Sequence, residues 1–198
     1  MYVDCVIYFV TSRTYNHQKL FQDDFACRLF LEVLDFCRHK LKFRLYAFVV
    51  MLDHIHLLIL PNSRNTISDV MRHIKGRFAN RYKQYLPTKD KFFGWQKGDN
   101  CLPAEDKFLC CRDGNKSTII KNPVGEEFIL AKGMPIWQKS FYDRIVRSDQ
   151  ELENTINYIN YNAVKHQLVA DPIDWLYSSF HNYCEMGKAL IEIDYVHL

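Results

Sequence analysis

Two histidines, His54 and His56, lie one residue apart inside the aliphatic run VVMLDHIHLLILP. If this run is a β-strand, its side chains alternate between the two faces, so both imidazoles point to the same face. Two imidazoles on one face can bind one ion, and imidazole nitrogen suits transition metals such as Mn2+. The spacing predicts half of a metal site. It is also compatible with two hydrogen-bonded polar residues at a hairpin corner, with Asp53 as the turn residue.

A metal held by two histidines needs further ligands, and the later stretch NTINYINYNAVKHQL offers several. Its candidate oxygen donors are Asn154, Asn157, Asn160 and Asn162. The same stretch carries Tyr158 and Tyr161, and a tyrosine phenol is a candidate nucleophile. In a helix, Tyr158 and Asn162 are four residues apart and share one face. Both tyrosines are also compatible with ordinary surface or core aromatic residues.

The hydrophobic pattern indicates the elements that must position these residues. Strands are predicted where β-branched and aromatic residues gather, at 2–13, 43–52, 55–61 and 135–147. Apolar residues at three- and four-residue steps predict helices over 23–43 and 66–85 and from Ser148 onward. Ser148 and Glu151 have the spacing of a capping box at the start of the last helix.

The order of these elements predicts an α+β fold. It matches a ferredoxin-like βαββαβ antiparallel sheet with helices on one face, followed by an additional C-terminal helix that carries the candidate nucleophiles Tyr158 and Tyr161. Residues from about 88 to 133 show little periodicity and hold five of the seven glycines, so we interpret them as a loop-rich insertion. The length of 198 residues favours a single domain, 1–198, that contains this insertion.

The composition indicates the cellular location of the protein more clearly than its binding partner. The seven cysteines show no repeated CxxC spacing, which favours reduced thiols and a cytoplasmic location. The spacing of Cys101, Cys110 and Cys111 does not match common zinc-finger patterns. No apolar run approaches the length of a membrane span. A net charge of +3 leaves the class of partner open.

Basic residues gather on the predicted helix 66–85 and around 135–147, where they can contact DNA phosphates or simply be solvated. Between residues 64 and 83 there are six lysines and arginines and one aspartate. Aromatic side chains in the second region, Trp137, Phe141 and Tyr142, can stack on unpaired bases. The candidate DNA-binding residues are Arg72, Lys75, Arg77, Arg81, Lys83, Lys139, Arg144, Arg147 and Lys165.

Three motifs in this order resemble the REP-associated tyrosine transposases, which belong to the single-tyrosine branch of the His-hydrophobic-His (HUH) nucleases. They are VVMLDHIHLLILP, WQKSFYDRIVRSDQELENTINYINYNAVKHQLV and DPIDWLYSSFHNY. The resemblance covers about residues 1–85 and 134–183. It implies that His54, His56 and Asn162 hold a divalent metal ion, Mg2+ or Mn2+, and that Tyr158 is the nucleophile. The chain departs from the family pattern at Ala163, where a proline usually follows Asn162, and in the long insertion.

The resemblance implies a metal-dependent single-stranded DNA transposase or endonuclease. Such an enzyme cleaves and rejoins DNA through a 5′-phosphotyrosine intermediate, acts on single-stranded or hairpin DNA, and usually works as a homodimer. One alternative is a domesticated nucleic-acid-binding protein of the same fold without strand-transfer activity. Another is a metal hydrolase that uses water and forms no covalent intermediate, for which Tyr158 would be dispensable.

Overall fold

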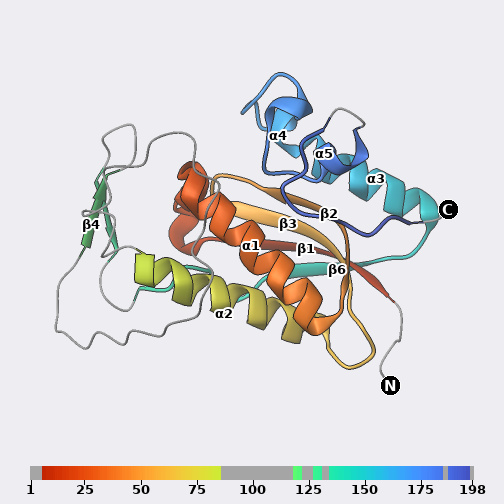
Figure 1. Cartoon of the computed structure of the whole chain (residues 1–198), viewed down its shortest axis with the longest axis horizontal. Helices are drawn as coiled ribbons and strands as arrows, with labels where there is room; N and C mark the ends of the chain where they lie inside the picture. The colour runs from red at the N-terminus through yellow and green to blue at the C-terminus, as the bar shows by residue number, and fades with distance from the viewer. Residues whose placement is uncertain (1–5, 86–117, 122–126, 131–133, 185–186, 197–198) are drawn as a thin grey trace. The chain divides into compact units, whose positions relative to one another are not determined.

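A computed structural model of the chain describes residues 6–85, 118–121, 127–130, 134–184 and 187–196 (Figure 1). The chain divides into two compact units, one formed by residues 1–81 together with 135–198, and the other by residues 82–134. Within the described ranges, no helix is long and apolar enough to cross a membrane.

The first unit is built on a four-stranded antiparallel sheet. Its strands are β1 (Ile7–Arg13), β2 (Arg44–Val50), β3 (His54–Leu60) and β6 (Tyr142–Val146), in the order β2-β3-β1-β6. One helix follows β1 and another follows β3 (Figure 1). This is the strand order of the ferredoxin-like βαββαβ fold, so the predicted α+β fold is confirmed.

Two long helices, α1 (Asp24–Leu41) and α2 (Ile67–Tyr85), lie side by side along one face of the sheet (Figure 1). Asp23 caps α1 by accepting a hydrogen bond from the backbone N–H of Phe25. Thr66 and Asp69 form a capping box at the start of α2, in which each side chain accepts a hydrogen bond from the other residue's backbone N–H. An aromatic cluster packs beneath the helices with ring centroids 5.5–6.0 Å apart, and it consists of Phe21, Phe30, Phe78 and Trp137.

The opposite face of the sheet is covered by α3 (Asp149–Asn160), which is followed by the short α4 (Asn162–Lys165). Side chains alternate along β3, so His54, His56 and Leu58 face α3 while the residues between them face α1 and α2. Leu58 joins Phe9 of β1 and Ile159 of α3 in one buried cluster. The helix that carries Tyr158 therefore covers the face that carries the histidine pair.

The C-terminal tail runs along the free edge of β2. The backbone N–H of Val50 donates to the carbonyl oxygen of Tyr177 at 2.9 Å, and the N–H of Ser179 donates to Phe48 at 2.8 Å. The buried Ser179 hydroxyl donates to Asn160 Oδ1 at 2.6 Å and accepts from the Phe48 N–H at 3.0 Å. The tail thus ties the edge of the sheet to the last residue of α3.

Short helices complete the first unit. They are the 3-10 turns η1 (Tyr15–His17), η2 (Leu20–Gln22) and η4 (Pro172–Asp174) and the helix α5 (Phe180–Tyr183). The second unit contains β4 (Thr118–Lys121) and β5 (Glu127–Leu130), which pair as an antiparallel hairpin. Sequence analysis did not anticipate this hairpin. Cys101, Cys110 and Cys111, considered above for zinc, lie outside the described residues.

The link through Ser179 leads to a stability prediction. Ser179→Ala should lower the free energy of unfolding by about 1–3 kcal/mol, because the backbone N–H of Phe48 and the side-chain Oδ1 of Asn160 lose their hydrogen-bond partner. Urea unfolding of the purified chain measures this change. Ser140→Ala, at an exposed position, is the control and should stay within about 0.5 kcal/mol of wild type. Equal stability of the Ser179 and Ser140 variants would contradict the proposed link.

Candidate active site

The histidine pair is almost fully buried, with His54 6% and His56 4% exposed. The two ring centroids are 4.9 Å apart. Each ring is held through Nδ1, which lies 2.6 Å from Asp53 Oδ1 for His54 and 2.8 Å from Thr11 Oγ1 for His56. This leaves Nε2 of each ring for a ligand, and Nε2 of His56 is buried without a hydrogen-bond partner among the described residues. Metal-binding histidines are typically anchored through their second nitrogen in this way.

The electrostatics of the pair favour the neutral imidazoles that a metal requires. Burial lowers the pKa of His56 to about 3, and the nearby His54 and Arg13 act in the same direction. Burial also lowers the pKa of His54, against the opposing effect of Asp53. Burial by itself would raise the pKa of Asp53, but hydrogen bonds from His54 and His17 outweigh it and hold that pKa below its usual value. Asp53 is therefore a carboxylate that orients a neutral His54.

Tyr158 lies beside the pair in the same chain. Its ring centroid is 5.5 Å from that of His56 and 5.9 Å from that of Phe9, with edge-on contacts to both. The ammonium of Lys165 lies 4.8 Å from the centre of the Tyr158 ring. The tyrosine is 38% exposed, so a large substrate can reach its phenol. One chain thus places a solvent-accessible phenol next to two buried imidazoles.

Asn162 is fully buried, and neither atom of its amide has a hydrogen-bond partner among the described residues. In the sequence, Asn162 lies midway between Tyr158 and His166. The ring centroid of His166 is 5.8 Å from that of His54. The backbone N–H of His166 donates to the carbonyl oxygen of Asn162. The four-residue spacing places Asn162 on the same side of this segment as Tyr158 and His166, whose rings lie near the histidine pair. A buried amide without partners costs about 1–3 kcal/mol, so a water, an ion or a ligand is expected to pair with it.

The other candidate oxygen donors are placed differently. Asn154 and Asn157 are exposed, and the Oδ1 atom of Asn160 already accepts a hydrogen bond from Ser179. Within the described ranges, no group of three or more His, Cys, Asp or Glu side chains is arranged to hold a metal. Among the four asparagines that the sequence offers as oxygen donors, Asn162 is therefore the one whose amide is both buried and without a hydrogen-bond partner among the described residues.

The helix is interrupted between the tyrosine and this asparagine. α3 ends at Asn160, and Tyr161 adopts φ −95° and ψ 9° before α4 begins at Asn162. The sequence lacks the proline that usually follows this asparagine in the family it resembles. The interruption therefore arises here without the steric effect of a proline ring.

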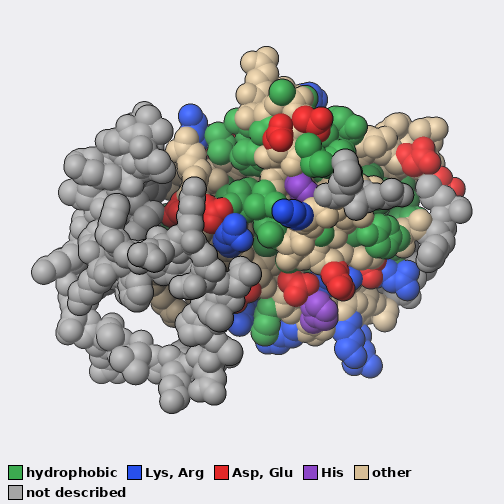
Figure 2. All heavy atoms as spheres, turned by 45° about the horizontal axis from the view of Figure 1, so that its top comes forward, with side chains coloured by type: hydrophobic (Ala, Val, Ile, Leu, Met, Phe, Trp, Pro, Cys, Tyr) green, Lys and Arg blue, Asp and Glu red, His purple; other side chains and the backbone are tan. Residues whose placement is uncertain are grey.

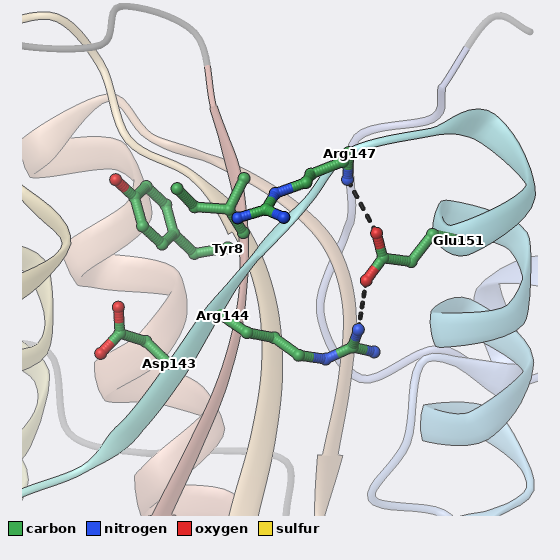
Figure 3. A pocket seen from close by; sticks show the side chains of 6 residues that line it. Tyr8, Asp143, Arg144, Arg147 and Glu151 are labelled. Atoms are coloured by element: carbon green, nitrogen blue, oxygen red, sulfur yellow. Dashed lines mark hydrogen bonds and ion pairs between the residues drawn. The ribbon is translucent and has the colours of Figure 1, made fainter.

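Two of the predicted DNA-binding residues, Arg144 and Lys165, lie on the same side of the sheet as the histidine pair. Arg144 forms an ion pair with Glu151, donates to Thr155 Oγ1 at 3.2 Å and lies 5.2 Å from the centre of the Phe9 ring. Arg147 is exposed, and its backbone N–H donates to Glu151 (Figure 3).

An open pocket of about 590 Å³ lies against β6. Figure 3 shows the side chains that line it. It is lined by Tyr8, Asp143, Arg144, Ile145, Arg147 and Glu151. This lining includes neither the histidine pair nor Tyr158, so the pocket is distinct from the candidate active site.

The basic residues of α2 lie in the other helical layer, and most have partners within the chain. Lys75 donates to the backbone oxygens of Gln138 and Ser140 at 2.9 and 3.3 Å, and burial lowers its pKa. The remaining pairs are Arg72 with Asp69, Arg77 over the Phe36 ring, and Arg81 with Glu32. Lys83 and Lys139 are exposed. The structure does not bring the α2 residues to the histidine pair.

Charges of both signs are interspersed on the face drawn in Figure 2, where no single sign dominates the visible described side chains. The described side chains visible on this face therefore do not form one large basic patch (Figure 2). Individual cations placed close to the site matter more for DNA contact than the small net charge of +3.

Sequence reasoning missed three residues that support the site. It took Asp53 only as a turn residue, and it did not single out Thr11 or Arg13. The β1–β3 register sets Thr11 opposite His56 and Arg13 opposite His54. The position of Asp53 directly before His54 was an available signal, whereas the two β1 residues depend on a register that periodicity does not reveal.

Comparison with known proteins defines first the fold and then the family. A solved structure described as a REP-associated tyrosine transposase bound to a REP hairpin superimposes with a TM-score of 0.62. It is 18% identical, and the match covers 100% of this chain and 92% of that one. The family model "Transposase IS200 like" matches residues 2–107, and the chain belongs to this family. The matched segment contains the histidine pair and ends before Tyr158.

Two curated relatives carry the same name. A Haemophilus influenzae protein, provisionally named a REP-associated tyrosine transposase, is 28% identical over 176 residues, which are 88% of this chain and 80% of that protein. The REP-associated tyrosine transposase of Escherichia coli K12 is 32% identical over 73 residues, which are 36% of this chain and 43% of that one. The family assignment made from the motifs is confirmed, and the chain is a transposase by family.

The unpaired amide of Asn162 leads to a prediction with opposite effects on stability and metal binding. Without metal, Asn162→Leu should raise the free energy of unfolding by about 1–3 kcal/mol, because it removes a buried polar group that has no partner. The stabilisation by Mn2+ expected for the wild-type chain should disappear.

Thermal unfolding with and without Mn2+ measures both effects. Asn154→Leu, which changes an exposed asparagine of α3, is the matched control and should keep the response to Mn2+. An Asn162→Leu chain that Mn2+ stabilises as much as wild type would exclude Asn162 as a ligand.

Proposed function

We propose that the chain is a metal-dependent single-stranded DNA transposase or endonuclease that cleaves and rejoins DNA through a 5′-phosphotyrosine at Tyr158. The observation that carries the proposal is the accessible Tyr158 phenol, whose ring centroid is 5.5 Å from that of His56. A structural relative is described as bound to a REP hairpin, which supports single-stranded or hairpin DNA as the substrate.

The metal site would consist of Nε2 of His54, Nε2 of His56 and Oδ1 of Asn162. A bound Mg2+ or Mn2+ ion supplies positive charge that stabilises the negative charge developing on the scissile phosphate. Burial lowers the pKa of both imidazoles, which favours their neutral forms, and His56 Nε2 and the Asn162 amide are buried without a hydrogen-bond partner among the described residues. Asp53 and Thr11 act as positioning residues, because each fixes the orientation of one ring.

Tyr158 carries out the covalent step. Its hydroxyl oxygen attacks phosphorus, so that a bond from Oη to phosphorus forms while the bond from phosphorus to the 3′-oxygen breaks. The phenol gives up its proton, and the departing 3′-oxygen takes one up, so no net proton is consumed. Attack by a 3′-hydroxyl on the phosphotyrosine reverses the exchange and rejoins DNA without an external energy source.

Two cations on the same side of the sheet as the histidine pair would bind the cleaved strand. Lys165 lies beside the Tyr158 ring, and Arg144 lies beside Phe9, which stacks on His56. Arg147 and Lys139 would extend this contact along β6 and the segment before it. The α2 residues would contact DNA away from the cleaved bond. Every such phosphate contact weakens with increasing salt concentration.

The homodimer expected from the family resemblance stays a prediction. Because His56 and Tyr158 of one chain are already in contact, a single subunit contains both groups. Light scattering of the purified protein measures the oligomeric state. A monomer would overturn the dimer prediction and leave the proposed chemistry intact.

Tyr158→Phe should abolish a covalent protein–DNA adduct, because it removes the nucleophilic oxygen and keeps the ring contacts with His56 and Phe9. The full chain is incubated with a library of hairpin DNAs and Mn2+ or Mg2+, and adducts are detected by denaturing electrophoresis. Tyr161→Phe changes another exposed tyrosine three residues away and should still form the adduct.

The other outcomes have distinct meanings. An adduct that persists in Tyr158→Phe would assign the nucleophile elsewhere. Cleavage without an adduct in either protein would indicate a hydrolase that uses water. Binding without cleavage of any hairpin would indicate a nucleic-acid-binding protein that lacks strand transfer.

A further inference from the structure

A row of side chains crosses three strands on the face that carries the histidine pair. The β1–β3 register pairs Thr11 with His56, and the β1–β6 register pairs Thr11 with Tyr142. Side chains of directly paired residues project from the same face of a sheet. Since neighbouring strands are about 4.8 Å apart, Tyr142 lies about 10 Å from His56 along this row.

Tyr142 presents an aromatic ring to solvent at the end of the row. It is 60% exposed, more than any other large hydrophobic side chain among the described residues. The two neighbouring aromatic residues that the sequence suggested for base stacking are placed differently. Trp137 is buried in the aromatic cluster, and Phe141 lies near the Lys75 ammonium. An exposed ring beside a phosphate site can serve as a stacking platform for an unpaired base.

Arg13 places a positive charge next to the same row. It pairs with His54 in the β1–β3 register and is a diagonal neighbour of Tyr142, within reach of a long side chain. Its side chain is 44% exposed. Its contacts are long, at 3.4 Å to His17 Nδ1 and 3.6 Å to Asp53 Oδ2, so most of its five donors are available to a phosphate.

We propose that Arg13 and Tyr142 form a subsite for one unpaired nucleotide next to the scissile phosphate. Arg13 binds the phosphate of that nucleotide, and Tyr142 stacks on its base. The subsite holds the strand across β1 and β6 so that the bond to be cleaved stays at the histidine pair. This inference rests on the proposed function, since it assumes that single-stranded DNA enters the site.

The test measures DNA binding without chemistry, in full-length protein that carries Tyr158→Phe. One probe is a DNA hairpin with single-stranded thymidine flanks, and the other is the same hairpin with abasic flanks. Tyr142→Ala should weaken binding to the thymidine probe by about 5- to 150-fold and leave binding to the abasic probe unchanged. Tyr142→Phe should retain the affinity of its parent.

Substitution of Arg13 should give a different pattern of binding to the two probes. Arg13→Gln should weaken binding to both probes equally, because both contain the phosphate. It should also reduce the slope of log affinity against log salt concentration by about 0.7. Fluorescence anisotropy over a range of salt concentrations measures both quantities.

Two matched variants serve as controls. Ile145→Ala shortens another exposed side chain of β6, on the opposite face of the strand. Arg28→Gln removes an arginine of α1 that is 52% exposed and, like Arg13, near one aspartate. Both should bind the two probes as their parent does.

The subsite is rejected if Tyr142→Ala binds the thymidine probe normally, if it loses both probes equally, or if the parent binds neither probe. Failure of the subsite and failure of the proposed function remain separable. A wild-type adduct with no effect of Tyr142→Ala would reject the subsite alone. Base-dependent binding through Tyr142 with no adduct from any hairpin would reject the covalent mechanism alone.

Discussion

The Ser179 hydroxyl is the hydrogen-bonded junction that ties the end of α3, the helix that carries Tyr158, to the sheet. Apolar contacts of α3 with the sheet, such as those of Leu152 and Ile159, hold the helix close but have no preferred direction. One directional contact comes from Ser179, which joins the last residue of α3 to the backbone of β2. Another comes from Arg144 of β6, which contacts Glu151 and Thr155 of α3. Together these contacts restrict the rotation of α3, and the contact between the Tyr158 and His56 rings depends on that rotation.

The candidate site combines strong anchoring with incomplete hydrogen bonding. Asp53 and Thr11 hold the two imidazole rings, yet His56 Nε2 and the amide of Asn162 are buried and have no hydrogen-bond partner among the described residues. Buried polar atoms are ordinarily paired, because an unpaired one destabilises the fold. The apolar packing on both faces of the sheet offsets this cost, so the rigid part of the fold supports a locally unsatisfied centre.

Periodicity in the sequence was sufficient to predict the sheet, its helices and the shared face of His54 and His56. The cap at Ser148 was also readable, and its hydroxyl does accept the N–H of Glu151. The supporting contacts could not be read in this way, because they depend on strand register and helix packing. Thr11 reaches His56 only through the β1–β3 register, and Arg77 contacts Phe36 only through the packing of α2 on α1. Local sequence carries neither piece of information.

The alternation of side chains along β1 and β3 also limits how a chain of this fold can change in length. Each side chain of these two strands points either to the face with the aromatic cluster or to the face with the histidine pair. One inserted residue would therefore move every side chain that follows it in the strand to the opposite face. A change in length is therefore tolerated more easily in the connections between elements than within β1 or β3. The long stretch between α2 and β6 is such a connection. Residues added there do not change which face of the sheet any strand side chain occupies.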